Sequence, residues 1–188
     1  MTKFFIVHGS YGNPEENWFP WLKKELESLG HIVYVPKFPT PENQNLENWV
    51  KIFEKYKNEI DKETILIGHS LGPAFILSIL EKINIKNKVK ACFFVSGFLN
   101  LLGNPTFDSV NKTFVQKKFN WKKIKENCGK FYIIHSDNDP YVPMKEAVNL
   151  AEKLGTVVIL IEKAGHFNES SGFKKFDFLL EMIKREIK

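Results

Sequence analysis

The chain has 188 residues, of which 43% are hydrophobic and 26% are charged, and this composition excludes an extended disordered chain. Its formal net charge of +5 comes almost entirely from lysine, because Arg185 is the only arginine, and the lysines are interspersed with acidic residues. That distribution argues against a nucleic-acid-binding surface, and no apolar run is long enough to cross a bilayer.

Six short apolar runs, rich in β-branched and aromatic residues, predict strands that are buried on both faces of a parallel sheet. They cover residues 4–7, 32–35, 64–67, 91–95, 131–134 and 156–161. Helical periodicity between and after these runs predicts helices that begin near Trp18, Leu46, Pro73, Pro143 and Phe173. The alternation predicts a three-layer α/β/α sandwich around a mostly parallel six-stranded sheet, as one domain over residues 1–188.

One segment, residues 98–120, breaks this alternation. It contains a Gly-Asn-Pro turn at residues 103–105, followed by a weakly helical, lysine-rich stretch. We interpret it as a small insertion or cap over one end of the sheet. Four of its apolar residues are candidates for lining an acyl-binding pocket, although packing in the core is the more common use of such side chains. They are Leu99, Leu101, Leu102 and Phe107.

The sequence Gly-His-Ser-Leu-Gly at residues 68–72 matches the pattern G-x-S-x-G. It directly follows the predicted strand 64–67 and directly precedes the most apolar helix of the chain. A strand–turn–helix context is what a nucleophile elbow requires, because the sharp turn presents the serine hydroxyl at the edge of the sheet. We therefore predict that Ser70 is a nucleophile; the alternative is a Gly/Ser turn that caps the helix without any chemistry.

A serine hydroxyl needs a base to activate it, and the base needs an acid to orient it. In this type of fold the chain order is serine, acid, histidine. The loop after the fifth strand offers Asp137 and Asp139, and we favour Asp139 because Pro140 restricts its backbone. The loop after the sixth strand offers His166 as the base. The four other histidines all come before the acid in the chain, namely His8, His31, His69 and His135.

An oxyanion hole requires two backbone donors. The residue after the nucleophile, Leu71, supplies the first. The loop after the first strand supplies the second, for which Ser10 is the first candidate and Tyr11 the next. The glycine patterns of dinucleotide-binding and phosphate-binding loops are absent, as is any His, Cys or Asp cluster at metal-ligand spacing. We therefore expect neither an organic cofactor nor a metal ion.

Several segments together resemble the small YdeN-like serine hydrolases, the family that includes retinoblastoma-binding protein 9. They are His8-Gly9 followed by Asn-Trp-Phe-Pro-Trp-Leu at 17–22, Pro-Thr-Pro at 39–41 with Trp49, Gly-His-Ser-Leu-Gly at 68–72, Asp-Pro-Tyr-Val-Pro at 139–143 and Gly-His-Phe at 165–167. The resemblance implies a compact α/β-hydrolase fold without a large cap domain. It also implies a Ser-His-Asp triad of Ser70, His166 and Asp139, and no cofactor.

These observations predict a carboxylesterase-like serine hydrolase that cleaves an ester or related acyl bond of a small substrate through an acyl-enzyme. Two alternatives stay open: an acyl transferase or perhydrolase that uses the same triad, and a protein-binding module on the same fold with little turnover.

The expected setting of the protein is the cytoplasm. Cys92 and Cys128 are too few for a disulfide framework, and the first residues lack the apolar core of a signal peptide. The sequence does not determine the oligomeric state, and a monomer is the simplest expectation.

Overall fold

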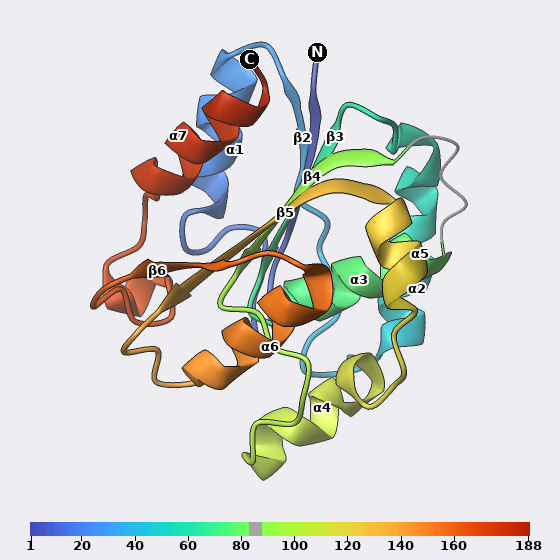
Figure 1. Cartoon of the computed structure of the whole chain (residues 1–188), viewed down its shortest axis with the longest axis vertical. Helices are drawn as coiled ribbons and strands as arrows, with labels where there is room; N and C mark the ends of the chain where they lie inside the picture. The colour runs from blue at the N-terminus through green and yellow to red at the C-terminus, as the bar shows by residue number, and fades with distance from the viewer. Residues whose placement is uncertain (83–87) are drawn as a thin grey trace.

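The computed structural model describes residues 1–82 and 88–188. Six parallel strands form one open sheet in the order β2-β1-β3-β4-β5-β6 (Figure 1). The strands are β1 (Lys3–Val7), β2 (Ile32–Tyr34), β3 (Thr64–His69), β4 (Val89–Val95), β5 (Cys128–Ser136) and β6 (Val158–Ile161). Among the described residues, no helix is both long and apolar enough to span a membrane.

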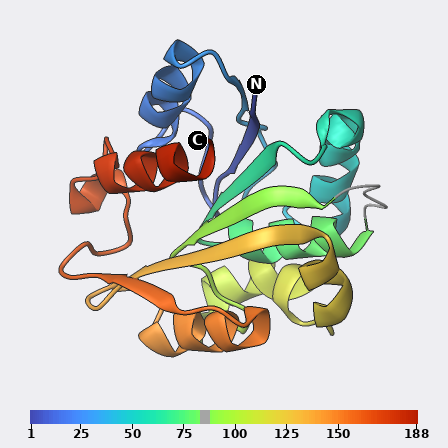
Figure 2. The same ribbon diagram turned by 45° about the horizontal axis from the view of Figure 1, so that its top comes forward.

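Helices cover both faces of this sheet, as Figures 1 and 2 show. They are α1 (Phe19–Ser28), α2 (Leu46–Phe53), α3 (Gly72–Lys82), α4 (Pro105–Val115), α5 (Trp121–Glu126), α6 (Met144–Leu154) and α7 (Asp177–Glu186), with 3₁₀ helices η1 (Glu54–Glu59) and η2 (Glu169–Ser171). Side chains alternate between the two faces of a strand, so Phe4 and Ile6 pack beside α1 and α7, whereas Phe5 and Val7 pack beside α2 and α3. The predicted three-layer α/β/α sandwich is confirmed, and its sheet is entirely parallel.

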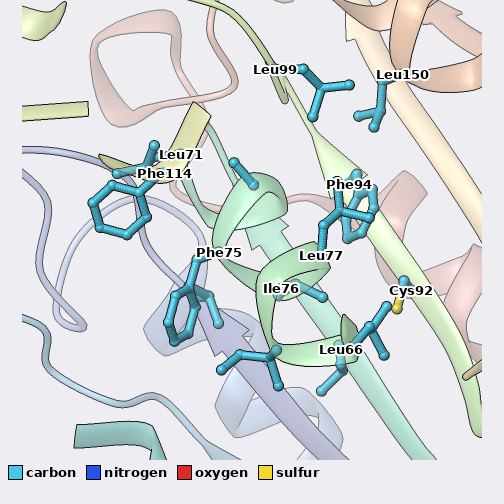
Figure 3. Packing of buried hydrophobic residues seen from close by; sticks show 14 of the residues in the cluster. Leu66, Leu71, Phe75, Ile76, Leu77, Cys92, Phe94, Leu99, Phe114 and Leu150 are labelled. Carbon is cyan, nitrogen blue, oxygen red and sulfur yellow. The ribbon is translucent and has the colours of Figure 1, made fainter. Parts of the chain in front are cut away.

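Helix α3 lies at the centre of one of the two apolar layers. Its residues from Gly72 to Leu80 are all buried, which agrees with the nearly continuous apolar run in the sequence. Figure 3 shows Phe75, Ile76 and Leu77 of this helix among side chains from β3, β4 and α6. Such burial holds the helix, and the turn that precedes it, in one position relative to the sheet.

The structure differs from the sequence-based boundaries at the end of the chain. The last helix begins at Asp177 and not at Phe173, because η2 and the loop after it occupy residues 169–176. The apolar residues at 173 and 176 instead pack against Phe167, with ring centroids 5.0 and 5.1 Å apart. The prediction of a helix start near Phe173 is therefore wrong, because the helical spacing of these apolar residues reflects the packing of a loop.

Helix α4 lies within the segment 98–120. Asn104 caps its first turn by accepting hydrogen bonds from the backbone N–H groups of Thr106 and Phe107. Phe114 is fully buried and packs edge-on against Trp49 of α2, with ring centroids 4.9 Å apart. The segment is thus anchored in the core through one face of its helix.

Candidate active site

The predicted nucleophile lies at a sharp turn between β3 and α3. Ser70 has a φ of +59°, a left-handed conformation that costs a non-glycine residue free energy, and its N–H donates to the Val95 carbonyl oxygen at 2.9 Å. A Cβ atom on Gly72 would lie 2.5 Å from the Val7 carbonyl oxygen, so only glycine allows strand and helix to approach this closely. The motif therefore forms a tight, strained elbow that holds the Ser70 side chain at the carboxyl edge of the sheet.

His166 and Asp139 form a buried hydrogen-bonded pair. The Nδ1 atom of His166 lies 2.8 Å from Oδ2 and 3.0 Å from Oδ1 of Asp139, and the Asp139 side chain is 1% exposed. Burial by itself raises the pKa of the Asp139 carboxyl. The hydrogen bond and charge of His166 and the N–H groups of Val142 and Tyr141 outweigh it and lower the pKa below the usual value. The carboxylate thus stays ionised and engages Nδ1 of His166, so Nε2 is the ring nitrogen that Asp139 does not contact.

Asp137 and Asn138 have a different task from Asp139. Oδ1 of Asp137 accepts a hydrogen bond from the Lys163 N–H at 2.7 Å, and Oδ1 of Asn138 accepts one from the Gly165 N–H at 2.7 Å. Neither side chain hydrogen-bonds the imidazole of His166 within the described part of the chain. Both therefore fasten the loop that carries His166 to the end of β5.

Two residues to which the sequence assigned no role in the site also hold the His166 loop. His69 donates from Nε2 to the His166 carbonyl oxygen at 2.7 Å, and Trp18 donates from Nε1 to the Phe167 carbonyl oxygen at 2.9 Å. Phe167 has a φ of +51°, a strained conformation that these two donors stabilise. The position of His69 beside Ser70 was visible in the sequence, but its contact with residue 166 depends on the tertiary structure.

Burial of His69 predicts a loss of stability in mild acid. Burial, and secondarily the charge of His166, lowers the pKa of His69 from 6.5 to about 3. Between these values the unfolded chain binds a proton that the folded chain does not, so the free energy of unfolding falls as pH decreases below 6.5. The expected loss from this residue is about 2 kcal/mol at pH 5.

Urea unfolding at pH 7.5 and pH 5 measures this loss, with His69→Gln as the comparison. The glutamine amide can donate to the same carbonyl but does not titrate, so its free energy of unfolding should fall less between the two pH values. His8, His31 and His135 also have lowered pKa values, chiefly through burial, and they add to the fall in the free energy of unfolding in both proteins. If the free energy of unfolding fell equally in wild type and His69→Gln, His69 would not be the source of the acid sensitivity.

The remaining histidines have structural contacts. His8 bridges the Gly9 carbonyl oxygen at 2.7 Å and the Phe38 N–H at 3.1 Å, which fixes the exit of β1. His135 donates from Nε2 to the Val142 carbonyl oxygen at 3.0 Å and so supports the turn that presents Asp139. His31 lies one residue before β2 and accepts a hydrogen bond from the Thr2 N–H at 3.3 Å.

A cavity of about 490 Å³ opens where these loops meet. Ser70 and His166 both line it, together with Ser10 and Tyr11 from the loop after β1. Of the four apolar residues proposed for an acyl pocket, Leu102 and Phe107 line this cavity, whereas Leu99 is buried in the core and Leu101 is 39% exposed. The carboxyl edge of the sheet is where ligands bind in open α/β folds, so this cavity is the candidate substrate site.

The loop after β1 lies directly against Ser70. A Cβ atom on Gly9 would be 2.7 Å from Cβ of Ser70. The N–H of Tyr11 donates to Oγ1 of Thr40 at 2.6 Å, so of the two predicted donors in this loop we retain Ser10. Leu71 lies immediately before α3, where backbone N–H groups have no partner within the helix. No group of three or more His, Cys, Asp or Glu side chains at metal-binding distance occurs in residues 1–82 and 88–188.

Comparisons with known proteins agree with this architecture. Residues 4–185 match the family described as "Serine hydrolase". YdeN of Bacillus subtilis (strain 168) is 31% identical over 184 residues, covering 97% of this chain and 95% of that protein. Serine hydrolase RBBP9 of Rattus norvegicus is 27% identical over 186 residues, covering 97% and 94%.

Solved structures show the same likeness. The crystal structure of the ydeN gene product from B. subtilis superposes with a TM-score of 0.92 at 29% identity, covering 99% of this chain and 98% of that one. An extracellular alpha/beta-hydrolase from a Paenibacillus species, at 19% identity, covers 99% of each chain with a TM-score of 0.65 and shares the fold. The chain, with its α/β-hydrolase fold and its likeness to YdeN, belongs to the serine hydrolase family.

Proposed function

We propose that this member of the serine hydrolase family cleaves a carboxylic ester or a related acyl bond of a small substrate, with Ser70 as nucleophile, His166 as base and Asp139 as acid. The observation that carries the proposal is the buried His166–Asp139 pair, which shares a cavity with a serine on a strained strand-to-helix turn. Nucleophile, base and orienting acid then come from the loops that follow three different strands of one sheet.

The chemistry follows from this arrangement. Nε2 of His166 accepts the hydroxyl proton while Oγ of Ser70 forms a bond to the acyl carbon, and the carbonyl oxygen becomes an oxyanion. The N–H groups of Leu71 and Ser10 stabilise that negative charge. The bond to the leaving group then breaks, and His166 returns the proton to the departing alcohol. Water repeats the sequence on the acyl-enzyme, releasing the acid and restoring Ser70.

The cavity supports a small acyl substrate. Its volume of about 490 Å³ lies within the range of small-molecule sites. Phe98, Leu102 and Phe107 give it an apolar wall, and the ring of Tyr141 lies edge-on to His166 with centroids 5.0 Å apart. A short aliphatic or aromatic acyl chain can bury its surface against these side chains.

Labelling with a fluorophosphonate tests the proposal, because such probes react with activated serines. We expect one adduct on the folded protein and none after denaturation. Trypsin yields a peptide of residues 63–82, which contains both Ser70 and Ser78, so fragmentation must place the adduct on Ser70. Absence of an adduct on well-folded protein would contradict an activated serine and would favour a protein-binding module. Adding an alcohol or peroxide acceptor during ester turnover separates hydrolysis from acyl transfer.

A further inference from the structure

The loop of residues 9–12 carries the second donor of the proposed oxyanion hole, but its own backbone holds it weakly. Gly12 donates to the Gly9 carbonyl oxygen at 3.3 Å, a long hydrogen bond, and Tyr11 has a φ of +59°. An oxyanion donor is effective because it already points at the developing charge before the reaction starts. The position of this loop must therefore be maintained by contacts from outside it.

Four hydrogen bonds supply these contacts. They form a relay, in which each side chain but the last accepts one hydrogen bond and donates the next. The N–H of Tyr11 donates to Oγ1 of Thr40 at 2.6 Å, and that hydroxyl donates onward to Oε1 of Gln44 at 2.5 Å. Nε2 of Gln44 donates to Oγ of Ser10 at 2.9 Å, and that hydroxyl donates to Oδ1 of Asn111 at 2.5 Å. The relay thus leaves the loop at Tyr11 and returns to it at Ser10. The side chain of Ser10 and the backbone N–H of Tyr11 are therefore both held, and together they fix the backbone of the residue that carries the Ser10 N–H.

The inner half of the relay, at Gln44 and Asn111, is shielded from water and lies next to α2 and within α4. Gln44 is 7% exposed and Asn111 is 1% exposed, so water does not compete for their hydrogen bonds. Gln44 immediately precedes Asn45, the N-cap of α2, and also donates to Oδ1 of Asn111 at 2.9 Å. Asn111 belongs to α4, whose Phe114 is fixed in the core.

We propose that Thr40, Gln44 and Asn111 are positioning residues, a clamp that fixes the oxyanion loop so that the Ser10 N–H points at the reacting oxygen. This inference rests on the proposed function, since it concerns the same transition state. It makes α4 a fixed support of the active site, in place of a lid that swings away from it. None of the three residues carries a charge or enters the G-x-S-x-G motif.

Two variants test the clamp without altering the wall of the cavity. Thr40→Val and Gln44→Leu remove links of the relay, and neither residue lines the cavity. We expect kcat for a short acyl ester to fall about 10- to 100-fold, part of the loss seen when an oxyanion donor is removed. KM should change less than about twofold. The affinity for a boronic acid, which forms a tetrahedral adduct with serine, should fall by the same factor as kcat.

Rescue and control variants separate this role from general stability. Thr40→Ser keeps the hydroxyl and should recover most of the lost kcat. The control is Lys117→Met, which removes contacts with Ser78 and Glu81 just beyond α4. It should loosen this part of the chain and leave kcat unchanged. Hydrogen exchange of residues 9–12, measured without substrate, should accelerate in Thr40→Val and Gln44→Leu.

The outcomes distinguish the clamp from the proposed function. Wild-type turnover with unaltered kcat and unaltered exchange in both relay variants would overturn the clamp alone. A change in KM without a change in kcat would also overturn it. The third outcome combines two results: the wild-type protein forms no fluorophosphonate adduct, and hydrogen exchange of residues 9–12 is accelerated in Thr40→Val and Gln44→Leu. This outcome would overturn the proposed function and leave the clamp as a structural feature of the loop.

Discussion

Replacement of Ser70 by alanine is expected to lower kcat for a short acyl ester by about four to six orders of magnitude. Alanine retains the backbone of the elbow and removes only the oxygen that forms the acyl-enzyme. The residual rate then reflects binding and the oxyanion donors alone. Steady-state hydrolysis and intact mass after phosphonate treatment measure the loss, and the variant should carry no adduct.

Ser170 offers a matched control for this substitution. It also lines the cavity, but its Oγ donates to Oδ1 of Asn168 at 2.8 Å. Ser170→Ala should therefore retain both turnover and labelling. The double variant Ser70→Ala/His166→Ala should be no slower than Ser70→Ala, because a base without its nucleophile contributes little. Wild-type turnover in Ser70→Ala would exclude Ser70 as the nucleophile.

Replacement of Asp139 by asparagine is expected to lower kcat by about three to four orders of magnitude. The carboxylate accepts the proton on Nδ1 of His166 at 2.8 Å. An asparagine amide can instead donate to Nδ1, which places the ring proton on Nε2, where it blocks transfer from Ser70. Binding contacts are untouched, so KM should change little while kcat falls.

Asp137→Asn is the matched comparison, two residues away in the same loop. Its remaining carbonyl oxygen can still accept the hydrogen bond from the Lys163 N–H, so kcat should stay within about threefold of wild type. The contrast is sharp because both variants remove one negative charge. If the two variants lost activity equally, the loss would come from the charge of the loop, and the assignment of Asp139 as the acid would be withdrawn.

The order of strands and helices along the chain, and the sheet edge at which the candidate site lies, can be predicted from the amino-acid sequence alone. Strands buried on both faces of a parallel sheet need continuous apolar runs, and such runs can be recognised in the sequence without any tertiary information. Because the strands are parallel, their carboxyl ends all lie at one edge of the sheet. The loops that carry Ser70, Asp139 and His166 therefore had to meet there. The start of the last helix could not be predicted in the same way, because Phe173 has the spacing of a helical residue but lies in a loop and packs against Phe176.

Which side chains meet at that edge depends on how the loops and helices pack in three dimensions. Asp137 and Asp139 share one loop, and the turn held by the N–H groups of Tyr141 and Val142 directs Asp139 alone toward His166. Gln44 and Asn111 are uncharged and have no motif, and the contact of Asn111 with Ser10 spans 101 residues of chain. Hydrogen bonds depend on distances of tenths of an ångström and on direction, and these are set when helices and loops pack together and not by the local sequence.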